Sequence, residues 1–486
     1  MFHSITRRQC LKTLALGAAL GPRFSSHAEE AKPNIVFILV DDLGWMDTGC
    51  YGSQYFETPH IDRLAAQGMR FTDAYAACAV CSPTRASILT GRYPARIGIT
   101  DWIRAGFQGG AGSTAAEYPT AYVGTPKEAV LCPPNPFWLK HEERTIAELL
   151  KEQGYTTCHI GKWHLGSEQW YPETQGFDYN IGGCDYGQPP SYFDPYKNNR
   201  LANIPTLPPR KEGEYLTDRL GDEAVAFIDA HADKPFFLYM ANYAVHTPLQ
   251  GKPDLVEKYT KKEKTQQSHP IYAAMVQSVD ECVGKIMRVL EEKGIADNTL
   301  ILFTGDNGGL SDGNPAPTNN QPLREGKGYP YEGGIREPLI VRWPRRIKAG
   351  TLCDTPVTSV DFLPTLCEAA GAALPADRAI DGLSLMPLLR KEGEWTREAI
   401  FWHFPHYRYC TDPYSIIRQG QWKLIKRYGQ GTMELYNLKE DLSETTDLAT
   451  EKPDIVNTLN ERLQAWLQET GAKVPIPNPE YDPLAK

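Results

Sequence analysis

Short segments that are apolar at every position alternate with amphipathic segments, and this alternation constrains the fold more than any other feature of the chain. A strand without a polar face must be buried on both sides, as in a sheet that helices cover on both faces. Strands of this kind are expected at residues 34–40, 155–160, 235–242, 299–304 and 339–343. Helices are expected at residues 58–66, 145–152, 222–230 and 273–293. Their order predicts an α/β fold, with a large doubly wound mixed sheet flanked by helices.

The pattern changes after about residue 392. Short strands are expected at residues 400–403, 414–418, 422–427 and 434–437, and a closing helix at 455–470. They predict a smaller C-terminal α+β subdomain, made of an antiparallel sheet and a helix. For a chain of 486 residues we therefore expect a large domain at 32–392, a subdomain at 393–475 and a tail at 476–486.

The first 28 residues have the features of an export signal peptide. Arg7 and Arg8 precede an apolar run at residues 14–20, which is too short to anchor the chain in a bilayer. Ser26 and Ala28 offer small side chains where a signal peptidase reads them. The arginine pair is typical of a twin-arginine signal, and a general secretory leader with an accidental pair is the alternative. Both interpretations predict an exported protein, periplasmic or extracellular.

The net charge argues against some classes of partner. The formal charge is −9, and loss of the leader would make it −13, because residues 1–28 carry four basic side chains and no acidic one. A chain this acidic suits neither nucleic acid nor an anionic membrane surface. We expect no nucleic-acid binding and no stable membrane anchor, and the sequence favours no particular oligomeric state. An anionic substrate would need positive charge gathered in one place.

Oxygen-bearing side chains follow two of the expected strands. Asp41 and Asp42 come directly after the first strand, and Asp306 and Asn307 follow the strand that ends at Thr304. In open α/β sheets the functional crevice lies beyond the carboxyl ends of the strands. Four hard oxygen donors there suit Ca²⁺, with Mg²⁺ as the less favoured ion, and no supporting His and Cys set indicates zinc. The alternative is that both pairs cap helices.

Cys81 stands near the expected start of a helix. Pro83 suits a first helical position, so Cys81 would lie at a helix N-terminus, where the helix dipole favours a negative charge. Arg85 adds a permanent cation in the first turn. These features indicate a reactive thiol. The alternatives are a small buried hydrophobe, or a redox pair with Cys78 in the chain's CxxC spacing.

Basic and imidazole groups follow other expected strands. Lys162 and His164 lie two residues apart, His246 follows the strand at 235–242, and Lys327 lies in a glycine-rich loop. Any one of them alone is more often structural or solvated than catalytic. Their joint placement beyond strand ends indicates one site for an anionic group.

Five motifs in this order along the chain resemble those of the type I, formylglycine-dependent sulfatases, which include arylsulfatases and N-acetylgalactosamine sulfatases within the alkaline phosphatase superfamily. The resemblance extends from about Lys32 to the terminal helix. The motifs are Asp41-Asp42-Leu-Gly44, Cys81-x-Pro-x-Arg85 with Leu-Thr-Gly-Arg92, Gly-Lys-Trp-His-Leu-Gly166, Thr-Gly-Asp-Asn-Gly308 and Gly-Lys-Gly…Tyr-Glu-Gly-Gly334. We see no departure from the family's pattern at the catalytic positions.

The resemblance implies a mechanism. A maturating enzyme would oxidise Cys81 to formylglycine (3-oxoalanine), and one oxygen of the aldehyde hydrate would attack the sulfate ester to give a covalent sulfo-enzyme intermediate. Arg85 and Lys162 would stabilise the ionised hydrate oxygen. His164 would take the proton of the second hydroxyl as the aldehyde re-forms and inorganic sulfate leaves.

The same resemblance implies the remaining roles. His246 and Lys327 would bind the sulfate group and protonate the leaving oxygen. A calcium ion would screen the sulfate oxygens and orient the hydrate. Its ligands would be Asp41, Asp42, Asp306 and Asn307.

The substrate is the least constrained feature. Export and a long surface loop expected at residues 105–138 favour a sulfated carbohydrate, such as a galactose or N-acetylgalactosamine sulfate. The aromatic segment 401–407 resembles one in carbohydrate sulfatases, which implies His403 and His406 as substrate contacts, although a packed aromatic strand explains it as well. Trp102 and Arg104 are similar candidates on another side of the site.

Two other functions fit parts of the pattern. One is a phosphomonoesterase or phosphonate hydrolase of the same superfamily, although such phosphatases usually need two zinc ions and more His and Asp ligands than the sequence offers. The other is an exported protein that binds sulfated glycans without hydrolysing them, because Cys81 is never oxidised. The complete catalytic set favours the enzyme, since a binding protein would not need His164 or Lys162.

Overall fold

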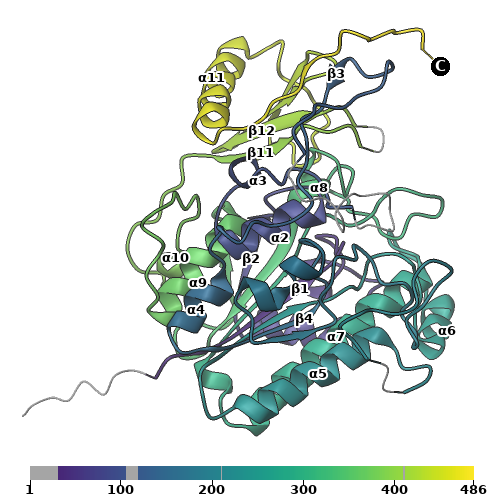
Figure 1. The fold of residues 1–486 in the computed structure, drawn as a ribbon, viewed down its shortest axis with the longest axis vertical. Helices are drawn as coiled ribbons and strands as arrows, with labels where there is room; N and C mark the ends of the chain where they lie inside the picture. The colour runs from purple at the N-terminus through teal and green to yellow at the C-terminus, as the bar shows by residue number, and fades with distance from the viewer. Residues whose placement is uncertain (1–30, 105–118, 209–210, 409–410, 486) are drawn as a thin grey trace, which may run out of the picture. The chain divides into compact units, whose positions relative to one another are not determined.

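The computed structural model describes residues 31–104, 119–208, 211–408 and 411–485, and residues 33–486 form one compact unit. Its largest feature is a sheet to which the described residues contribute nine strands, in the order β10-β2-β8-β7-β1-β6-β4-β5, with β9 paired to β2 (Figure 1). The strands are β1 (Asn34–Val40), β2 (Met69–Tyr75), β4 (Thr156–Gly161), β5 (Tyr179–Ile181), β6 (Phe236–Ala241), β7 (Thr299–Gly305), β8 (Arg336–Arg342), β9 (Thr351–Cys353) and β10 (Val357–Thr358).

The central strands of this sheet run parallel. β1 pairs in parallel with both β6 and β7, and β4 pairs in parallel with β5 and β6. β8 is antiparallel to both of its neighbours, β7 and β2. The predicted mixed α/β sheet is therefore confirmed, and the carboxyl ends of β1, β4, β6 and β7 lie at one edge.

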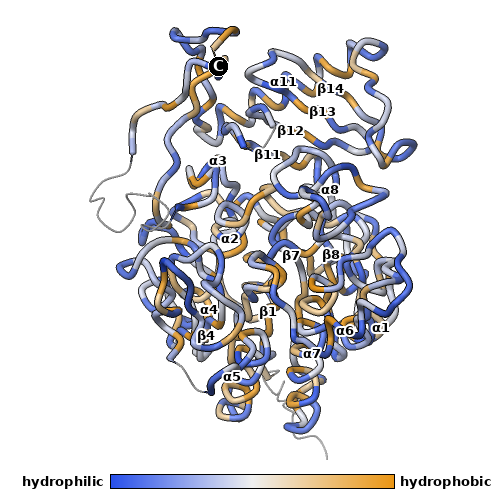
Figure 2. Tube along the Cα trace, turned by 90° about the vertical axis from the view of Figure 1, so that its right-hand side faces the viewer, coloured by the Kyte–Doolittle hydropathy of each residue, from blue (hydrophilic) through white to orange (hydrophobic). Residues whose placement is uncertain are grey.

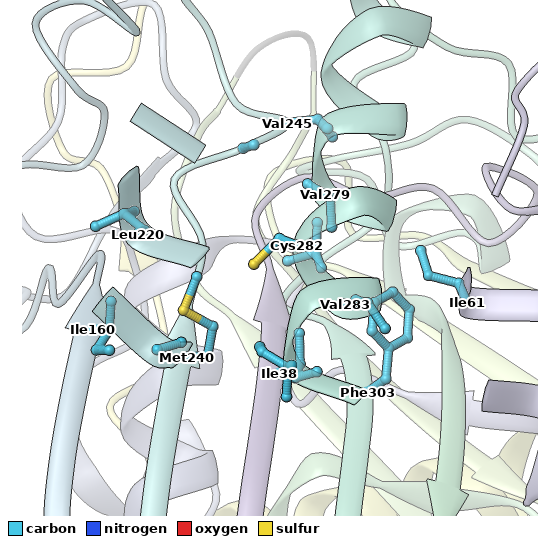
Figure 3. Packing of buried hydrophobic residues seen from close by; sticks show 14 of the residues in the cluster. Ile38, Ile61, Ile160, Leu220, Met240, Val245, Val279, Cys282, Val283 and Phe303 are labelled. Atoms are coloured by element: carbon cyan, nitrogen blue, oxygen red, sulfur yellow. The ribbon is translucent and has the colours of Figure 1, made fainter. Parts of the chain in front are cut away.

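Every position of β1 is buried because helices cover both faces of the sheet. Val36 and Ile38 of β1 join a core with residues of α1 (Pro59–Ala66), α5 (Leu216–His231) and α7 (Pro270–Glu292). Figure 3 shows part of this core, where Ile38 lies near Val283 and Phe303. The alternate residues Ile35, Phe37 and Leu39 join the opposite core. That core includes residues of α2 (Cys81–Thr90), α4 (Ile146–Glu152), α9 (Phe362–Ala370) and α10 (Met386–Arg390).

A second sheet contains four antiparallel strands and lies beside α2, away from α5 and α7 (Figures 1 and 2). Its strands are β11 (Ile400–Phe404), β12 (Tyr414–Gln419), β13 (Trp422–Arg427) and β14 (Met433–Asn437). α11 (Pro453–Glu469) packs on this sheet, and the ring of Trp466 stacks on Phe401 with centroids 4.8 Å apart. The predicted antiparallel sheet with one helix is confirmed. The boundaries expected at residues 392 and 475 stay predictions.

The remaining α-helices and strands of the described residues are short. They are α3 (Pro94–Ile97), α6 (Pro253–Lys261), α8 (Glu332–Ile335) and a two-stranded pairing of β3 (Val130–Leu131) with β15 (Ile476–Pro477). Among the described residues, no helix has the length and apolar character that crossing a membrane requires. The predicted leader at residues 1–28 and most of the first half of the predicted loop at 105–138 lie outside the described residues.

Three of the differences between the local predictions and the structure bear on the site or on the sheet. The helix expected at 222–230 begins earlier, at Leu216, because Leu216 and Leu220 pack into the core ahead of the expected start. The helix that carries Cys81 begins at Cys81 itself rather than at Pro83. β2 was not expected, since its polar residues interrupt the apolar pattern, yet it pairs with β8 and β9.

Candidate active site

The acidic residues lie where the parallel strands end. The backbone N–H of Asp306 donates to the carbonyl of Val40 at 3.2 Å, which joins the ends of β1 and β7. The N–H of Asp42 donates to Asp306 Oδ1 at 3.2 Å. Tyr272 of α7 donates its hydroxyl to the carbonyl of Asp42 at 3.1 Å. The expected meeting of both motifs at one sheet edge is therefore observed.

Each acid has its own cationic partner. Lys162 Nζ lies 2.6 Å from Asp41 Oδ2. Lys327 Nζ lies 2.6 and 2.9 Å from the two oxygens of Asp42. Arg85 NH2 lies 2.8 Å from Asp306 Oδ2, and its NH1 donates to the carbonyl of Lys162 at 2.9 Å. All six side chains are at most 4% exposed, so three positive and three negative charges share one buried space.

The carboxyl groups of Asp41 and Asp42 differ in their pKa values. Burial and the nearby Asp306 raise the pKa of Asp41 to about 8, although Lys162 opposes the shift. Burial is also the largest influence on Asp42, but the charges of Lys327, His246 and Lys162 together outweigh it and hold the pKa of Asp42 below its usual range. Of these two carboxyl groups, Asp41 is thus the one that lacks positive charge, which a divalent cation would supply.

Cys81 lies at the N-terminus of α2 and faces His164. Its Sγ is 3.3 Å from Nδ1 of His164. Ser82 holds this arrangement, because its hydroxyl donates to the carbonyl of His164 at 3.0 Å and accepts the N–H of Ile103 at 2.9 Å. The nine cysteines at positions other than 10 and 410, Cys78 and Cys81 included, are free thiols.

Hydrogen bonding fixes the tautomer of His164. Its Nε2 lies 2.7 Å from the carbonyl of Ile103, and a carbonyl can only accept, so Nε2 carries the hydrogen. Nδ1 therefore presents a lone pair to residue 81. Burial lowers the pKa of His164 well below its ordinary value, and the charges of Lys162 and Arg85 lower it further. The residue is a neutral imidazole that can accept a proton at Nδ1.

His246 closes another side of the site. Its Nδ1 lies 2.9 Å from the carbonyl of Thr247, which directs Nε2 toward Asp42 Oδ2 at 3.5 Å. Burial lowers the pKa of His246 to about 3, with a further contribution from Lys327. In this arrangement Nε2 is an acceptor that can bind a metal ion, or take up a proton when an anion lies beside it.

A cavity of about 190 Å³ opens above these groups. Five predicted residues of the catalytic and metal set line it, namely Asp42, Cys81, His164, His246 and Lys327. The other five lie buried beneath, namely Asp41, Arg85, Lys162, Asp306 and Asn307. The sequence does not single out Gly187, Gln188, Thr247, Leu310 or Arg408, which also line the cavity. Thr247 directly follows His246, and Arg408 directly follows the aromatic segment 401–407.

The four predicted substrate contacts are placed differently from one another. Trp102 lines the cavity, and the guanidinium carbon of Arg104 lies 5.4 Å from its ring centroid. His403 is buried and bonds Ser415 Oγ at 2.7 Å and the carbonyl of Lys473 at 3.1 Å. His406 bonds Thr100 Oγ1 at 2.8 Å and is also buried. Neither histidine belongs to the cavity lining, so their contact with substrate stays a prediction.

The donor set fits a hard cation. Asp41, Asp42 and His246 can present three ligand atoms within 4.8 Å of one another. Two buried oxygens nearby, Asp41 Oδ1 and Asn307 Oδ1, have no hydrogen-bond donor. Buried acceptors without donors are costly, and a cation that they ligate would remove that cost. Asp41, Asp42 and His246 can therefore hold a metal ion at the carboxyl-end edge of the large sheet.

A larger cavity lies elsewhere and carries no comparable chemistry. It measures about 1170 Å³ and is bounded by residues 315–325 and 443–445. None of the predicted catalytic or metal residues lines it. The small cavity at the strand ends is thus the candidate active site, because the titratable groups converge there.

Comparison with known proteins assigns this arrangement to a class of hydrolases. The model of the sulfatase family matches residues 33–372, and the C-terminal model of N-sulphoglucosamine sulphohydrolase matches residues 326–470. The chain belongs to the sulfatase family, whose members are sulfuric ester hydrolases.

Individual relatives cover most of the chain. A sulfatase of Formosa agariphila is 34% identical over 98% of both chains. The human N-acetylgalactosamine-6-sulfatase is 36% identical over 80% of this chain and 74% of its own length. Among solved structures, Ps i-CgsB in complex with k-i-k-neocarrahexaose has 32% identity and a TM-score of 0.74, covering 90% of this chain and 93% of that one.

Proposed function

We propose that this sulfatase acts through formylglycine at residue 81 and releases inorganic sulfate from a sulfated carbohydrate. The observation that carries the proposal is the approach of Cys81 Sγ to the unprotonated Nδ1 of His164, at 3.3 Å, on the floor of a buried cavity. When residue 81 is an aldehyde hydrate, it supplies one hydroxyl to attack sulfur and a second to expel sulfate from the sulfo-enzyme intermediate.

The residues around position 81 support this chemistry. His164 accepts at Nδ1 the proton of the second hydroxyl, because its other nitrogen is committed to the carbonyl of Ile103. Arg85 and Lys162 bring permanent positive charge beneath residue 81, which stabilises an ionised oxygen there. Lys327 lies at the cavity wall, where it can contact the sulfate group.

His246 has the role of the acid that protonates the leaving oxygen. The neutral state found beside Asp42 is the state without an anion in the cavity. A bound sulfate ester adds negative charge next to Nε2, which favours the imidazolium form. The proton can then pass to the departing alcohol.

Calcium is the metal that we propose for the acidic edge. Asp41, Asp42, Asp306 and Asn307 would hold it, and it would screen the charge of the sulfate oxygens. The set contains three carboxylates and one amide, which are hard donors and favour Ca²⁺ over Mg²⁺ where the site is not strictly octahedral. The same residues bind Lys162, Lys327 and Arg85, so the cation would share its ligands with these side chains.

The nature of the relatives supports a sulfated sugar as substrate. Several relatives are N-acetylgalactosamine-6-sulfatases, and Ps i-CgsB is solved in complex with k-i-k-neocarrahexaose. Steryl-sulfatase is also a relative, at 32% identity, so the alcohol is not restricted by family alone. Among sulfated sugars, we propose a galactose sulfate or an N-acetylgalactosamine sulfate as the preferred substrate. We also propose an exported enzyme, matured by a formylglycine-generating partner.

Mass spectrometry of the tryptic peptide from Phe71 to Arg85 tests the nucleophile. We expect an aldehyde or its hydrate at residue 81 in protein from the native host, together with release of sulfate from sulfated sugars. A free thiol in protein that nevertheless hydrolyses sulfate esters would overturn the formylglycine mechanism. Cys81→Ala is the matched control for background hydrolysis.

Competing turnover of sulfate and phosphate esters tests the rival function. Phosphonate monoester hydrolase of Agrobacterium radiobacter shares the fold, with a TM-score of 0.65 at 19% identity, so the fold does not discriminate. We expect sulfate esters to be turned over faster and added zinc not to help. Faster phosphate or phosphonate ester turnover, raised by zinc, would favour the phosphatase.

A further inference from the structure

Two guanidinium groups lie against one indole ring beside the active-site cavity. The guanidinium carbon of Arg408 is 5.0 Å from the ring centroid of Trp102, and that of Arg104 is 5.4 Å away. Both distances are within the range of cation–π contacts, which hold a guanidinium group in place without neutralising its charge. Trp102 and Arg408 line the cavity together with Cys81 and His164.

Exposure separates these arginines from the reacting groups. Cys81, His164 and Lys327 are at most 4% exposed, so they form the floor of the cavity. The side chain of Arg408 is 18% exposed, and Arg104 is exposed to solvent. The arginines therefore stand where the cavity meets solvent, on the path that the rest of a bound substrate would take.

The described residues at this opening carry more positive than negative charge. Asp101 is the acidic group beside Arg408, with its Oδ1 3.7 Å from NH1. His406 adds no charge, because burial lowers its pKa and the two arginines lower it further, although Asp101 opposes them. Among the residues that the structure describes here, two guanidinium groups thus lie near one carboxylate, in a protein whose overall charge is −9.

The cavity has room for little more than one sulfated sugar unit. Its volume of about 190 Å³ is below the roughly 300–1,000 Å³ of sites that enclose a drug-sized ligand. The sugar that follows the sulfated unit must then lie at the opening, beside Arg104 and Arg408. A guanidinium group matches the geometry of sulfate and carboxylate groups, since both can accept two parallel hydrogen bonds.

We propose that Arg104 and Arg408, oriented by Trp102, form a subsite for a second anionic group, a sulfate or carboxylate on the sugar next to the one being desulfated. The inference rests on the proposed function, and it defines the substrate class as a polyanionic glycan. Isolated monosulfated sugars and aryl sulfates would contact only the residues of the cavity floor and not the two arginines. The chain segment around the C-terminal sheet thereby contributes to specificity, because Arg408 follows β11.

The test uses the mature full-length enzyme and three disaccharides that share one sulfated sugar. The neighbouring sugar is neutral in the first, sulfated in the second and carboxylated in the third. We expect kcat/KM to be higher for the two disaccharides with an anionic neighbour, and their difference shows which anion the subsite prefers. Added salt should reduce this preference, since the arginines are partly exposed.

Arg408→Ala and Arg104→Ala should each reduce kcat/KM about 10- to 100-fold for the anionic disaccharides, the scale of a hydrogen bond to a charged group. The loss for the neutral disaccharide should be several-fold smaller. Arg63→Ala is the matched control, because Arg63 lies on α1 in an exposed ion pair with Glu291 and carries the same charge. The Arg104 variant keeps the test valid if the less exposed Arg408 is needed for folding.

The outcomes separate the subsite from the proposed function. Equal kcat/KM for all three disaccharides in the unaltered enzyme would overturn the subsite alone, and so would equal losses on all three in both variants. Absence of turnover for every disaccharide in protein that carries an aldehyde at residue 81 would instead overturn the proposed function. A preference that disappears in the arginine variants and persists in Arg63→Ala would support the inference.

Discussion

Two charge clusters in the described part of the protein contain equal numbers of acidic and basic side chains, and they differ in how completely their carboxylate oxygens are paired. The catalytic charge cluster consists of Asp41, Asp42, Asp306, Arg85, Lys162 and Lys327. The inter-sheet charge cluster lies between the large sheet and the C-terminal sheet. It consists of Asp73, Glu332, Glu444, Arg336, Arg418 and Lys423. Each holds three acids and three bases.

In the inter-sheet charge cluster every carboxylate oxygen has a cation or a hydrogen-bond donor within 3.0 Å, although Glu444 Oε1 is held by an ion pair alone. Lys423 Nζ lies 3.0 Å from Glu332 and 2.8 Å from Glu444, and the second oxygen of Glu444 accepts the N–H of Glu332 at 2.7 Å. Tyr75 donates to the other oxygen of Glu332 at 2.6 Å. The two oxygens of Asp73 accept from Arg336 and from Arg418. The cluster is complete without a ligand.

The catalytic charge cluster lacks this completeness. Asp41 Oδ1 has no hydrogen-bond donor, and Arg85 NH2 lies 3.8 Å from it. The pKa values do not separate the two clusters, because each contains one carboxyl group of raised pKa and one of lowered pKa. Burial raises the pKa of Asp41 to about 8 and that of Glu444 to about 7, whereas nearby cations lower the pKa of Asp42 and lower that of Glu332 to about 2. The inter-sheet charge cluster pairs its own charges and connects the two sheets. The catalytic charge cluster keeps an acceptor without a donor, so it can bind a cation and a substrate.

The largest effect should come from Lys423→Met. Loss of this ammonium leaves Glu332 and Glu444 buried without their common partner, which should reduce the free energy of unfolding by about 3–5 kcal/mol. Chemical denaturation followed by tryptophan fluorescence measures the change. The turnover rate of the molecules that remain folded should stay near that of the unaltered enzyme, because Lys423 lies outside the candidate site. Full stability in this variant would contradict the role of the inter-sheet charge cluster.

Lys327→Met makes the same chemical change in the catalytic charge cluster and should give the opposite result. We expect kcat/KM for a sulfate ester to fall roughly 10²- to 10³-fold, the effect of removing one electrostatic donor, or about 2.7–4 kcal/mol. At saturating Ca²⁺ the stability loss should be smaller than for Lys423→Met, because the cation offsets the charge of Asp42. Steady-state kinetics and denaturation on the same preparation distinguish the two clusters. A larger stability loss than that of Lys423→Met would contradict the proposed difference between the catalytic and the inter-sheet charge clusters.

Calcium should stabilise the protein through the catalytic charge cluster. At a free concentration of 100 times its Kd, Ca²⁺ should add about 2.7 kcal/mol to the free energy of unfolding. Thermal unfolding with and without a chelator measures this effect. Asp41→Asn should diminish the calcium-dependent shift, and Asp73→Asn, in the inter-sheet charge cluster, should leave it intact. A shift that Asp41→Asn does not alter would place the ion elsewhere.

The smallest effect is expected at the surface. Lys285→Met breaks an ion pair with Asp222 at 2.7 Å, but the two side chains are 30% and 42% exposed. Exposed pairs contribute about 0–1 kcal/mol, so stability and turnover should both stay close to those of the unaltered enzyme. This variant calibrates the two buried lysine variants. A loss as large as that of Lys423→Met would show that burial does not explain the comparison.

Much of the fold could be predicted because the apolar pattern is local. β1 occupies the expected residues 34–40, since a run that is apolar at every position fits only a strand covered on both faces. The sequence did not predict β2, because its apolar residues do not form a strand pattern. Pairing with β8 and β9 makes this segment a strand. The early start of α5 has a similar cause, because packing of Leu216 extends the helix beyond its amphipathic segment.

Part of the candidate site could be predicted in the same way. The motifs marked ten candidate catalytic and metal residues, several of them by positions after strands, and the structure brings all ten together at one edge of the sheet. The substrate contacts stay predictions, because His403 and His406 are buried in contacts with Ser415 and Thr100 and do not line the cavity. Arg408 carried no local signal, and only its placement beside Trp102 brings it to the cavity.

The sequence by itself determined which strands are buried, which side chains follow them, and therefore which residues can meet at the sheet edge. Only the tertiary structure decided how these charges pair. Lys162 reaches Asp41 from 121 residues away, and the carbonyl of Ile103 decides which nitrogen of His164 faces Cys81. The physical reason is that burial and pairing depend on neighbours from distant segments, and those neighbours decide whether a buried charge is satisfied within the protein or left able to bind a ligand.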